Sequence, residues 1–171
     1  MLVFLFEKFL SRGLGLRPAR TSDKGFLENL YRSTRHDLRL LDAEADFIET
    51  LIEQQHHART TGYGERFPDA MYFVIEISKE SIGQIVINFG ENEVRLIDIS
   101  LISSARNKGY GKSLIEMLQY ASSAVNAPLR LSVHKQNMLA RDLYQSLGFQ
   151  LEQSGEISDV MVWVSESAPV I

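Results

Sequence analysis

The chain has 171 residues and 44% hydrophobic content, which suits one domain with a substantial core and is too little for two comfortable ones. Its formal net charge of -4 argues against a general nucleic-acid surface, because that affinity comes mainly from many Lys and Arg contacts with phosphate. Because the sequence contains no cysteine, structural disulfides, thiolate metal sites and a cysteinyl acyl-enzyme are excluded.

The first ten residues are apolar, but they include Glu7 and Lys8 and lack a basic n-region and a small-residue cleavage site. They are also far fewer than the ~20 apolar residues that span a bilayer. We therefore expect no signal peptide, no membrane partner and a cytoplasmic location. We assign residues 1–12 to an N-terminal extension, 13–165 to one domain and 166–171 to a C-terminal tail.

The first half of the chain predicts one strand and two helices. The strand covers Leu14 to Arg20, and Thr21-Ser22-Asp23 can cap the helix that follows. A second helix is expected over roughly 45–60, followed by a loop over 62–69. Its predicted apolar stripe consists of Phe47, Ile48, Leu51 and Ile52.

Adjacent His56 and His57 lie in the second of these helices. Neighbouring helical side chains point about 100° apart, so the two rings cannot easily share an ion. We expect no metal site here.

The second half predicts a mixed sheet. Three strands, Met71–Ile77, Ile82–Phe89 and Val94–Ile102, are joined by short turns, which imply antiparallel neighbours. A helix then leads to a strand at Leu129–Val133, and such a strand, helix, strand unit favours a right-handed parallel crossover. The segment 151–164 predicts a terminal hairpin.

The loop Arg106-Asn107-Lys108-Gly109-Tyr110-Gly111-Lys112 joins the third of these strands to its helix. Two glycines and three cations at a helix N-terminus suit phosphate. A Walker A loop requires glycine where Arg106 stands, and a dinucleotide fingerprint requires glycine where Leu114 stands. Neither pattern is therefore matched. The alternative to a phosphate site is an ordinary turn whose cations are solvated.

A second informative stretch begins at Asn137, which can start a helix that Gly148 ends in the left-handed conformation. Leu139, Leu143 and Leu147 are its predicted core face. Asn137 and Tyr144 lie nearly on one line about 10.5 Å apart along the helix, so they could flank one extended ligand. The alternative role of Tyr144 is that of an aromatic residue packed in the core.

The pattern Arg-x-x-Gly-x-Gly between strand and helix, followed by Asn…Ala…Leu-Tyr…Gly-Phe, resembles the two cofactor motifs of the GNAT superfamily of acyl-CoA-dependent N-acetyltransferases. The resemblance runs from the first strand to Trp163, and before Met71 it matches only in outline. It implies an α/β (α+β) fold with a mixed, mostly antiparallel sheet of about seven strands and helices on both faces. It also implies that the fourth and fifth strands splay apart to admit acetyl-CoA. In such a fold the terminal strands can form the contacts of a homodimer.

The same resemblance implies which residues bind acetyl-CoA, with the pantetheine arm on the strand end and the pyrophosphate on the loop. Family members often have proline where this chain has Ser103, and Lys108 and Lys112 either contact phosphates or are merely solvated. The implied cofactor-binding residues are Leu101, Ile102, Ser103, Arg106, Asn107, Lys108, Gly109, Tyr110, Gly111, Lys112, Asn137 and Tyr144.

Acetyl transfer to an amine requires a base, because an alkyl ammonium with a pKa of about 10.4 is mostly protonated at neutral pH. Asp98 shares a strand face with Ser100 and is the first candidate, with His134 second and ordered water third. The alternative for Asp98 is a structural pair with Arg95 or a nearby cation. The departing thiolate can take a proton from Tyr144, and a backbone N–H near Leu101 can stabilise the thioester oxygen.

These features favour a sequential N-acetyltransferase whose acceptor is a small-molecule or peptide amine. The alternative is a non-catalytic acyl-CoA-binding or sensing module on the same fold. A P-loop hydrolase is disfavoured, since no Asp ends the strand 129–133 to hold magnesium. The acceptor stays open: acidic residues could attract a cationic amine or simply form a polar helix surface, and these are Asp37, Asp42, Glu44 and Asp46.

Overall fold

The computed structural model describes residues 13–166, so the predicted N-terminal extension and residues 167–171 lie outside the described residues. The strands are β1 (Leu14–Pro18), β2 (Met71–Ile77), β3 (Glu80–Phe89), β4 (Val94–Leu101), β5 (Leu129–His134), β6 (Gln150–Ser154) and β7 (Ser158–Trp163). The helices are η1 (Thr21–Asp23), α2 (Lys24–Thr34), α3 (His36–Arg39), α4 (Ala45–Arg66), η2 (Ser103–Ala105), α5 (Tyr110–Ala124) and α6 (Met138–Ser146). Among these helices none is long and apolar enough to cross a membrane.

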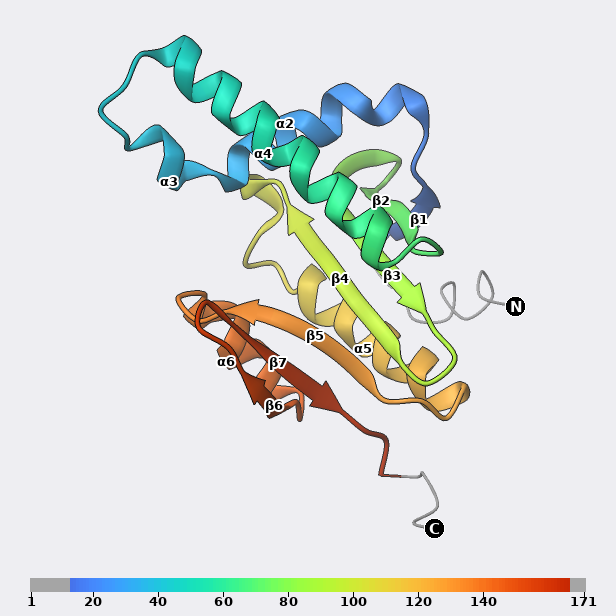
Figure 1. The fold of residues 1–171 in the computed structure, drawn as a ribbon. Coiled ribbons are helices and arrows are strands. Elements are labelled where there is room, and N and C mark those ends of the chain that lie inside the picture. Colours follow the sequence, from blue (N-terminus) through green and yellow to red (C-terminus); the bar gives the residue numbers. More distant parts are fainter. Residues whose placement is uncertain (1–12, 167–171) are drawn as a thin grey trace.

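The seven strands form one sheet in the order β1-β2-β3-β4-β5-β7-β6 (Figure 1). Every neighbouring pair is antiparallel except β4 and β5, which run parallel and are connected in the chain through α5. The predicted mixed, mostly antiparallel sheet is therefore confirmed.

The fourth and fifth strands separate part of the way along their length, as predicted. They pair only where Val94–Leu96 lies beside Leu129–Leu131. Beyond that point β4 continues to Leu101, while β5 stays paired with β7 as far as His134, so the two strands diverge (Figure 1). The sheet therefore has a gap between β4 and β5 but stays continuous through the paired residues at one end of these strands.

A β-bulge in β4 lies where this separation begins. Asp98 faces Val86 across the sheet and Leu96 faces Ile87, so Ile97 is the extra residue. A bulge bends its strand and shifts the alternation of side chains by one position. Leu96 consequently packs into the main core, whereas Asp98 turns to the opposite face of the sheet.

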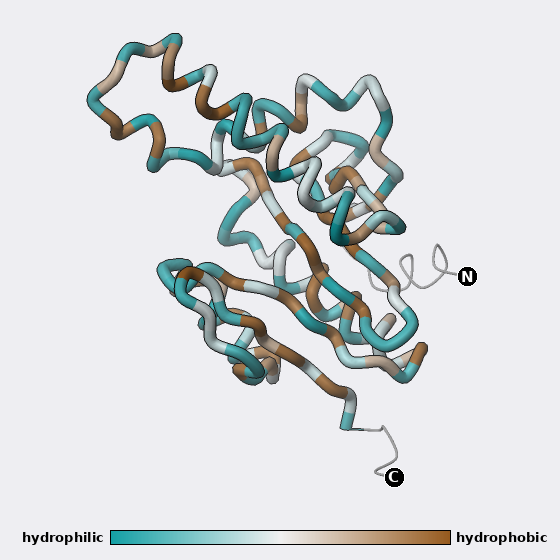
Figure 2. The backbone as a smooth tube through the Cα atoms, in the orientation of Figure 1, coloured by the Kyte–Doolittle hydropathy of each residue, from teal (hydrophilic) through white to brown (hydrophobic). Residues whose placement is uncertain are grey.

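Helices cover both faces of the sheet, as predicted. On one face α5 packs Leu114, Ile115 and Leu118, all fully buried, against the central strands. On the other face α2, α3 and α4 meet in a smaller cluster of Tyr31, Leu38, Ile48 and Ile52. Hydrophobic segments recur along the central strands and α5 in Figure 2.

The helix-side predictions need three corrections. Helix α4 does not end near residue 60 but continues through both glycines to Arg66, because packing of the long helix outweighs the roughly 1 kcal/mol cost of each helical glycine. Phe47 is 59% exposed and Leu139 is 80% exposed, so neither belongs to the core. In both helices the side chains that face the protein interior begin one residue after the predicted position, which is about 100° around the helix. They begin at Ile48 in α4 and at Ala140 in α6.

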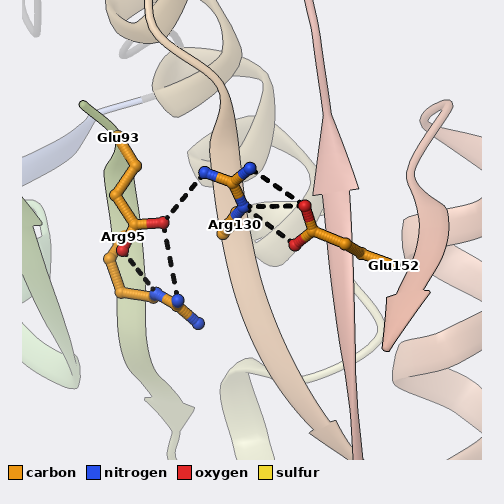
Figure 3. A network of polar contacts seen from close by, with 4 residues as sticks. All are labelled: Glu93, Arg95, Arg130 and Glu152. Carbon is orange, nitrogen blue, oxygen red and sulfur yellow. Dashed lines mark hydrogen bonds and ion pairs between the residues drawn. The ribbon is translucent and has the colours of Figure 1, made fainter. Parts of the chain in front are cut away.

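An ionic network spans the closed end of the splay (Figure 3). Arg95 and Arg130 are partners in the β4–β5 pairing, so their like charges lie side by side. Glu93 accepts a hydrogen bond from each of them at 3.1 Å, and Arg130 also pairs with Glu152 at 2.8 Å. The network therefore holds the strands together immediately before they separate.

Candidate active site

The glycine loop presents backbone N–H groups rather than pairing them internally. Asn107 and Gly109 have left-handed φ values of 59° and 85°, which turn the chain sharply before α5 begins. Among the backbone bonds within residues 13–166, none is donated by the N–H groups of residues 107 to 112. These groups lie at the positive end of α5, an arrangement suited to a phosphate.

The strand end beside this loop is fixed by local bonds. The N–H of Ile102 donates to the carbonyl of Ile82 at 2.8 Å, and Ser103 opens the single turn η2. The guanidinium of Arg106 folds back and donates to the carbonyl of Leu101 at 2.9 Å. Leu101 to Lys112 therefore form one continuous edge from the mouth of the splay to the start of α5, with the side chains of Lys108 and Lys112 exposed.

A cleft of about 140 Å³ lies between the separated parts of β4 and β5. It is bordered by Asp98 from β4, His134 from β5, and Asn137 and Tyr144 from the α6 segment. Asn137 caps α6 by accepting a hydrogen bond from the N–H of Ala140 at 3.2 Å. The two residues predicted to flank one ligand therefore do border the same cleft.

Tyr144 is both a packed aromatic and a cleft residue. It is 7% exposed, and its ring contacts that of Phe149 with centroids 5.7 Å apart. Burial, and secondarily the charge of Asp98, raises the pKa of Tyr144 to about 12. The phenol is therefore protonated throughout the neutral range and can act as a proton donor.

Asp98 is held by two polar contacts. Ser100 Oγ lies 3.3 Å from one carboxylate oxygen, as their shared strand face predicts, and Arg59 pairs with the same oxygen at 2.7 Å. Asp98 therefore pairs with a nearby cation, as its alternative interpretation predicts, but that cation is Arg59 and not Arg95, which bonds to Glu93. Burial raises the pKa of the Asp98 carboxyl above its ordinary 3.8, and the guanidinium of Arg59 opposes that rise.

Arg59 is a site residue that sequence reasoning missed. Its guanidinium lies between the rings of Tyr31 and Tyr63, with its central carbon 5.2 and 5.3 Å from their centroids. Such cation–π contacts fix the orientation of the group. The spacing of Arg59 and Tyr63, one helical turn apart, was a usable signal, but the helix was predicted to end too early to reveal it.

A second cavity of about 540 Å³ lies between α2, α4 and strands β2 to β4. Its floor is apolar and buried, with Leu30, Ile52 and Val86 each no more than 3% exposed. Asp98 lines this cavity as well as the smaller cleft, so one residue of β4 borders both spaces.

Other predicted candidates lie elsewhere or make local contacts. His134 borders the smaller cleft, and its Nδ1 accepts the N–H of Gln136 at 3.2 Å. His56 stacks on Tyr31 at 4.7 Å. The described residues contain no group of three or more side chains suited to a metal ion. Neither cavity is lined by Asp37, Asp42, Glu44 or Asp46.

Solved structures with a similar fold include several acetyltransferases. The PaiA N-acetyltransferase of Thermoplasma acidophilum, in complex with coenzyme A, aligns with a TM-score of 0.67 and 18% identity over 89% of this chain and 99% of that one. An acetyltransferase of Thermus thermophilus gives 0.63 and 18% over 89% and 97%. RimJ of Mycobacterium smegmatis, in complex with CoA-disulfide, gives 0.62 and 19% over 92% and 84%. At these identities the likeness establishes the fold.

The sequence itself establishes the family. Residues 27–149 match the Acetyltransferase (GNAT) family, which covers most of the chain, including the glycine loop and the Asn137 to Phe149 segment. The chain therefore belongs to the GNAT acetyltransferase family, as its two motifs predicted. No curated protein matches the chain.

Proposed function

We propose that this protein transfers an acetyl group from acetyl-CoA to a primary amine by direct attack, with residues 13–165 as the catalytic domain. The observation that carries the proposal is the position of Asp98, which borders both the cleft between β4 and β5 and the larger cavity. A donor in one space and an acceptor in the other can meet beside it. The proposal needs no covalent enzyme intermediate.

The donor side uses the separated strand and the glycine loop. The main chain of β4 beyond Leu96 has no partner in β5, so its polar groups can pair with the amides of pantetheine as an added strand would. The N–H groups of residues 107 to 112 then receive the diphosphate. Coenzyme A in the Thermoplasma protein and CoA-disulfide in the Mycobacterium protein, both of similar fold, support this assignment.

The chemistry follows from the two ionisable groups at the cleft. The amine nitrogen attacks the thioester carbon, a C–N bond forms, and the C–S bond breaks. Asp98 accepts the proton that the amine loses, while Tyr144 donates a proton to the departing sulfur. A backbone N–H near Leu101, at the end of β4, stabilises the negative thioester oxygen.

The test is a panel of amine acceptors, assayed for free thiol with acetyl-CoA and with longer acyl-CoA donors. Amine-dependent release of thiol, with the acetylated amine as second product, is the expected result. Acetyl-CoA binding without any amine-dependent thiol release would instead favour a binding or sensing module. The second cavity argues for the enzyme, because a sensor needs no acceptor site.

Cytoplasmic location and homodimer formation stay predictions. Cell fractionation tests the first, and sedimentation of the purified protein tests the second.

A further inference from the structure

The inner end of the larger cavity carries an ion pair rather than a lone carboxylate. Arg59 and Asp98 are joined at 2.7 Å, and both line the cavity. We propose that the acceptor is a free α-amino acid with an apolar or aromatic side chain, whose amine is received by Asp98 and whose carboxylate is received by Arg59. This inference rests on the proposed function and names its acceptor class.

The ion pair is complementary to the two charged groups of an amino acid. An α-amino acid carries a cation and an anion on one carbon, so each can face the opposite charge of an adjacent Asp–Arg pair. A guanidinium has several N–H donors in a planar fork that matches a carboxylate. The Arg59 side chain is 28% exposed and lines the cavity, so it can extend a donor to a ligand while keeping its bond to Asp98.

Arg59 is also fixed well enough to act as an anchor. The rings of Tyr31 and Tyr63 lie on its guanidinium at 5.2 and 5.3 Å. Tyr31 is itself held, because its hydroxyl accepts a hydrogen bond from Arg35 at 2.8 Å and its ring stacks on His56. A cation whose position is set before binding loses less freedom when it receives an anion.

The floor of the cavity fits an apolar side chain, and charged residues such as Lys24, Glu28 and Glu53 line other parts of it. Leu30, Ile52 and Val86 form a buried floor, and Tyr72 supplies a further aromatic wall. The volume of about 540 Å³ lies within the range of small-molecule sites. A peptide N-terminus has no free carboxylate on its first residue, so the Arg59 contact favours the free amino acid over a protein acceptor.

The step balances without a further reactant. Before attack the ammonium of the amino acid loses a proton, which Asp98 accepts. The nitrogen then forms the new C–N bond as the C–S bond breaks, and the sulfur gains the Tyr144 proton. The second proton that the nitrogen loses returns to the Tyr144 oxygen, and Asp98 releases its proton to solvent. The products are an N-acetylated amino acid and coenzyme A, and the carboxylate of the amino acid stays on Arg59 throughout.

Matched acceptors test the carboxylate contact. Phenylalanine is compared with phenethylamine, and leucine with 3-methylbutylamine, each pair differing only in the carboxylate. A charged hydrogen bond that the amine lacks predicts a kcat/KM ratio of about ten- to a hundredfold in favour of at least one amino acid. Calorimetric binding of the same compounds to the protein loaded with coenzyme A should show the same preference.

Substitution of Arg59 assigns the preference to its residue. In Arg59→Met the preferred ratio should fall to within about threefold of unity, since the side chain keeps its packing between the tyrosines and loses its charge. Arg66→Met is the matched control. Arg66 belongs to the same helix and lies over the Phe67 ring, at 5.4 Å, but does not line the cavity, so its removal should leave the ratio unchanged.

The outcomes separate this inference from the proposed function. Wild-type ratios of about three or less in both pairs, in turnover or in binding, overturn the amino-acid assignment while transfer to other amines upholds the enzyme. A preference that survives in Arg59→Met also overturns it. Failure of acetyl-CoA to bind contradicts the proposed function, whereas amino-acid binding measured on the protein without coenzyme A still decides the acceptor site.

Discussion

Replacement of Tyr144 with phenylalanine removes one hydroxyl and keeps the ring that packs on Phe149. The proposed mechanism requires that hydroxyl to donate a proton to the departing sulfur. We therefore expect a loss of turnover with little change in the folded structure or in the affinity for acetyl-CoA.

The magnitude follows from the two pKa values involved. Burial raises the pKa of Tyr144 to about 12, whereas a thiol such as that of coenzyme A has a pKa of about 8.5. Complete transfer to the free thiolate is therefore uphill by about 5 kcal/mol, so the phenol acts chiefly as a hydrogen-bond donor while charge builds on sulfur. This places the expected loss of kcat at about 10²- to 10³-fold, in the lower part of the range for general acids.

The assay measures thiol release at saturating acetyl-CoA and acceptor, with acetyl-CoA binding followed separately. The dissociation constant should change by less than about threefold, and the free energy of unfolding by less than about 1 kcal/mol. An acetyl thioester of a more acidic thiol needs less help from an acid, so its loss should be smaller. The rate should show no decline from Tyr144 until the pH nears its pKa of about 12.

Two results would refute this reasoning. A loss of kcat below about threefold would show that the phenol does not donate the proton. An equal loss for both thioesters, accompanied by weaker acetyl-CoA binding, would assign Tyr144 to cofactor packing instead.

Three further substitutions test the base, the loop and the strand network. Asp98→Asn should lower kcat/KM by about 10²- to 10⁴-fold. It should also abolish the rise of the rate with pH on the acidic side of the profile, because that rise follows the loss of a proton from a carboxyl whose pKa is raised by burial. An unchanged acidic side of the profile would contradict the role of Asp98 as the base. Gly111→Ala should stabilise α5 by about 0.5–1 kcal/mol in thermal unfolding, because no atom lies within 4 Å of the new methyl group. The same methyl group should weaken acetyl-CoA binding, because it occupies the space that the diphosphate approaches. Unchanged acetyl-CoA affinity would place the diphosphate elsewhere. Glu93→Gln should lower the free energy of unfolding by about 1 kcal/mol, because the neighbouring charges of Arg95 and Arg130 then lose the carboxylate that they share. The loss should become smaller as salt is added. A loss that does not depend on salt would point to packing alone.

The sheet could be predicted from the sequence because its signals are local. The bounds of β2 match the predicted Met71–Ile77, and α6 begins after Asn137 and ends before Gly148 at a φ of 90°. The register with period two also placed Ser100 and Asp98 on one face. Each of these depends on spacing or turn chemistry within a few residues.

The helical layer was harder to predict, because amphipathic stripes one residue apart look alike in a sequence. Phe47 and Leu139 each stand beside the position that is actually buried, and only contact with the sheet decides between them. Arg59 was missed for a related reason. Its partners come from α2 and β4, which are distant in the sequence, and a partly buried cation is recognised by its surroundings rather than by spacing.

The bulge at Ile97 connects these observations. In a regular strand Leu96 and Asp98 would share a face, so burial of Leu96 against α5 would place the Asp98 carboxylate toward the same core. The extra residue lets Leu96 remain buried while Asp98 faces Arg59 and the larger cavity. It also lies one residue beyond the last β4–β5 pair, where a bent strand can leave its neighbour. One local irregularity thus accounts for both the opening that the donor requires and the direction of the carboxylate that meets the acceptor.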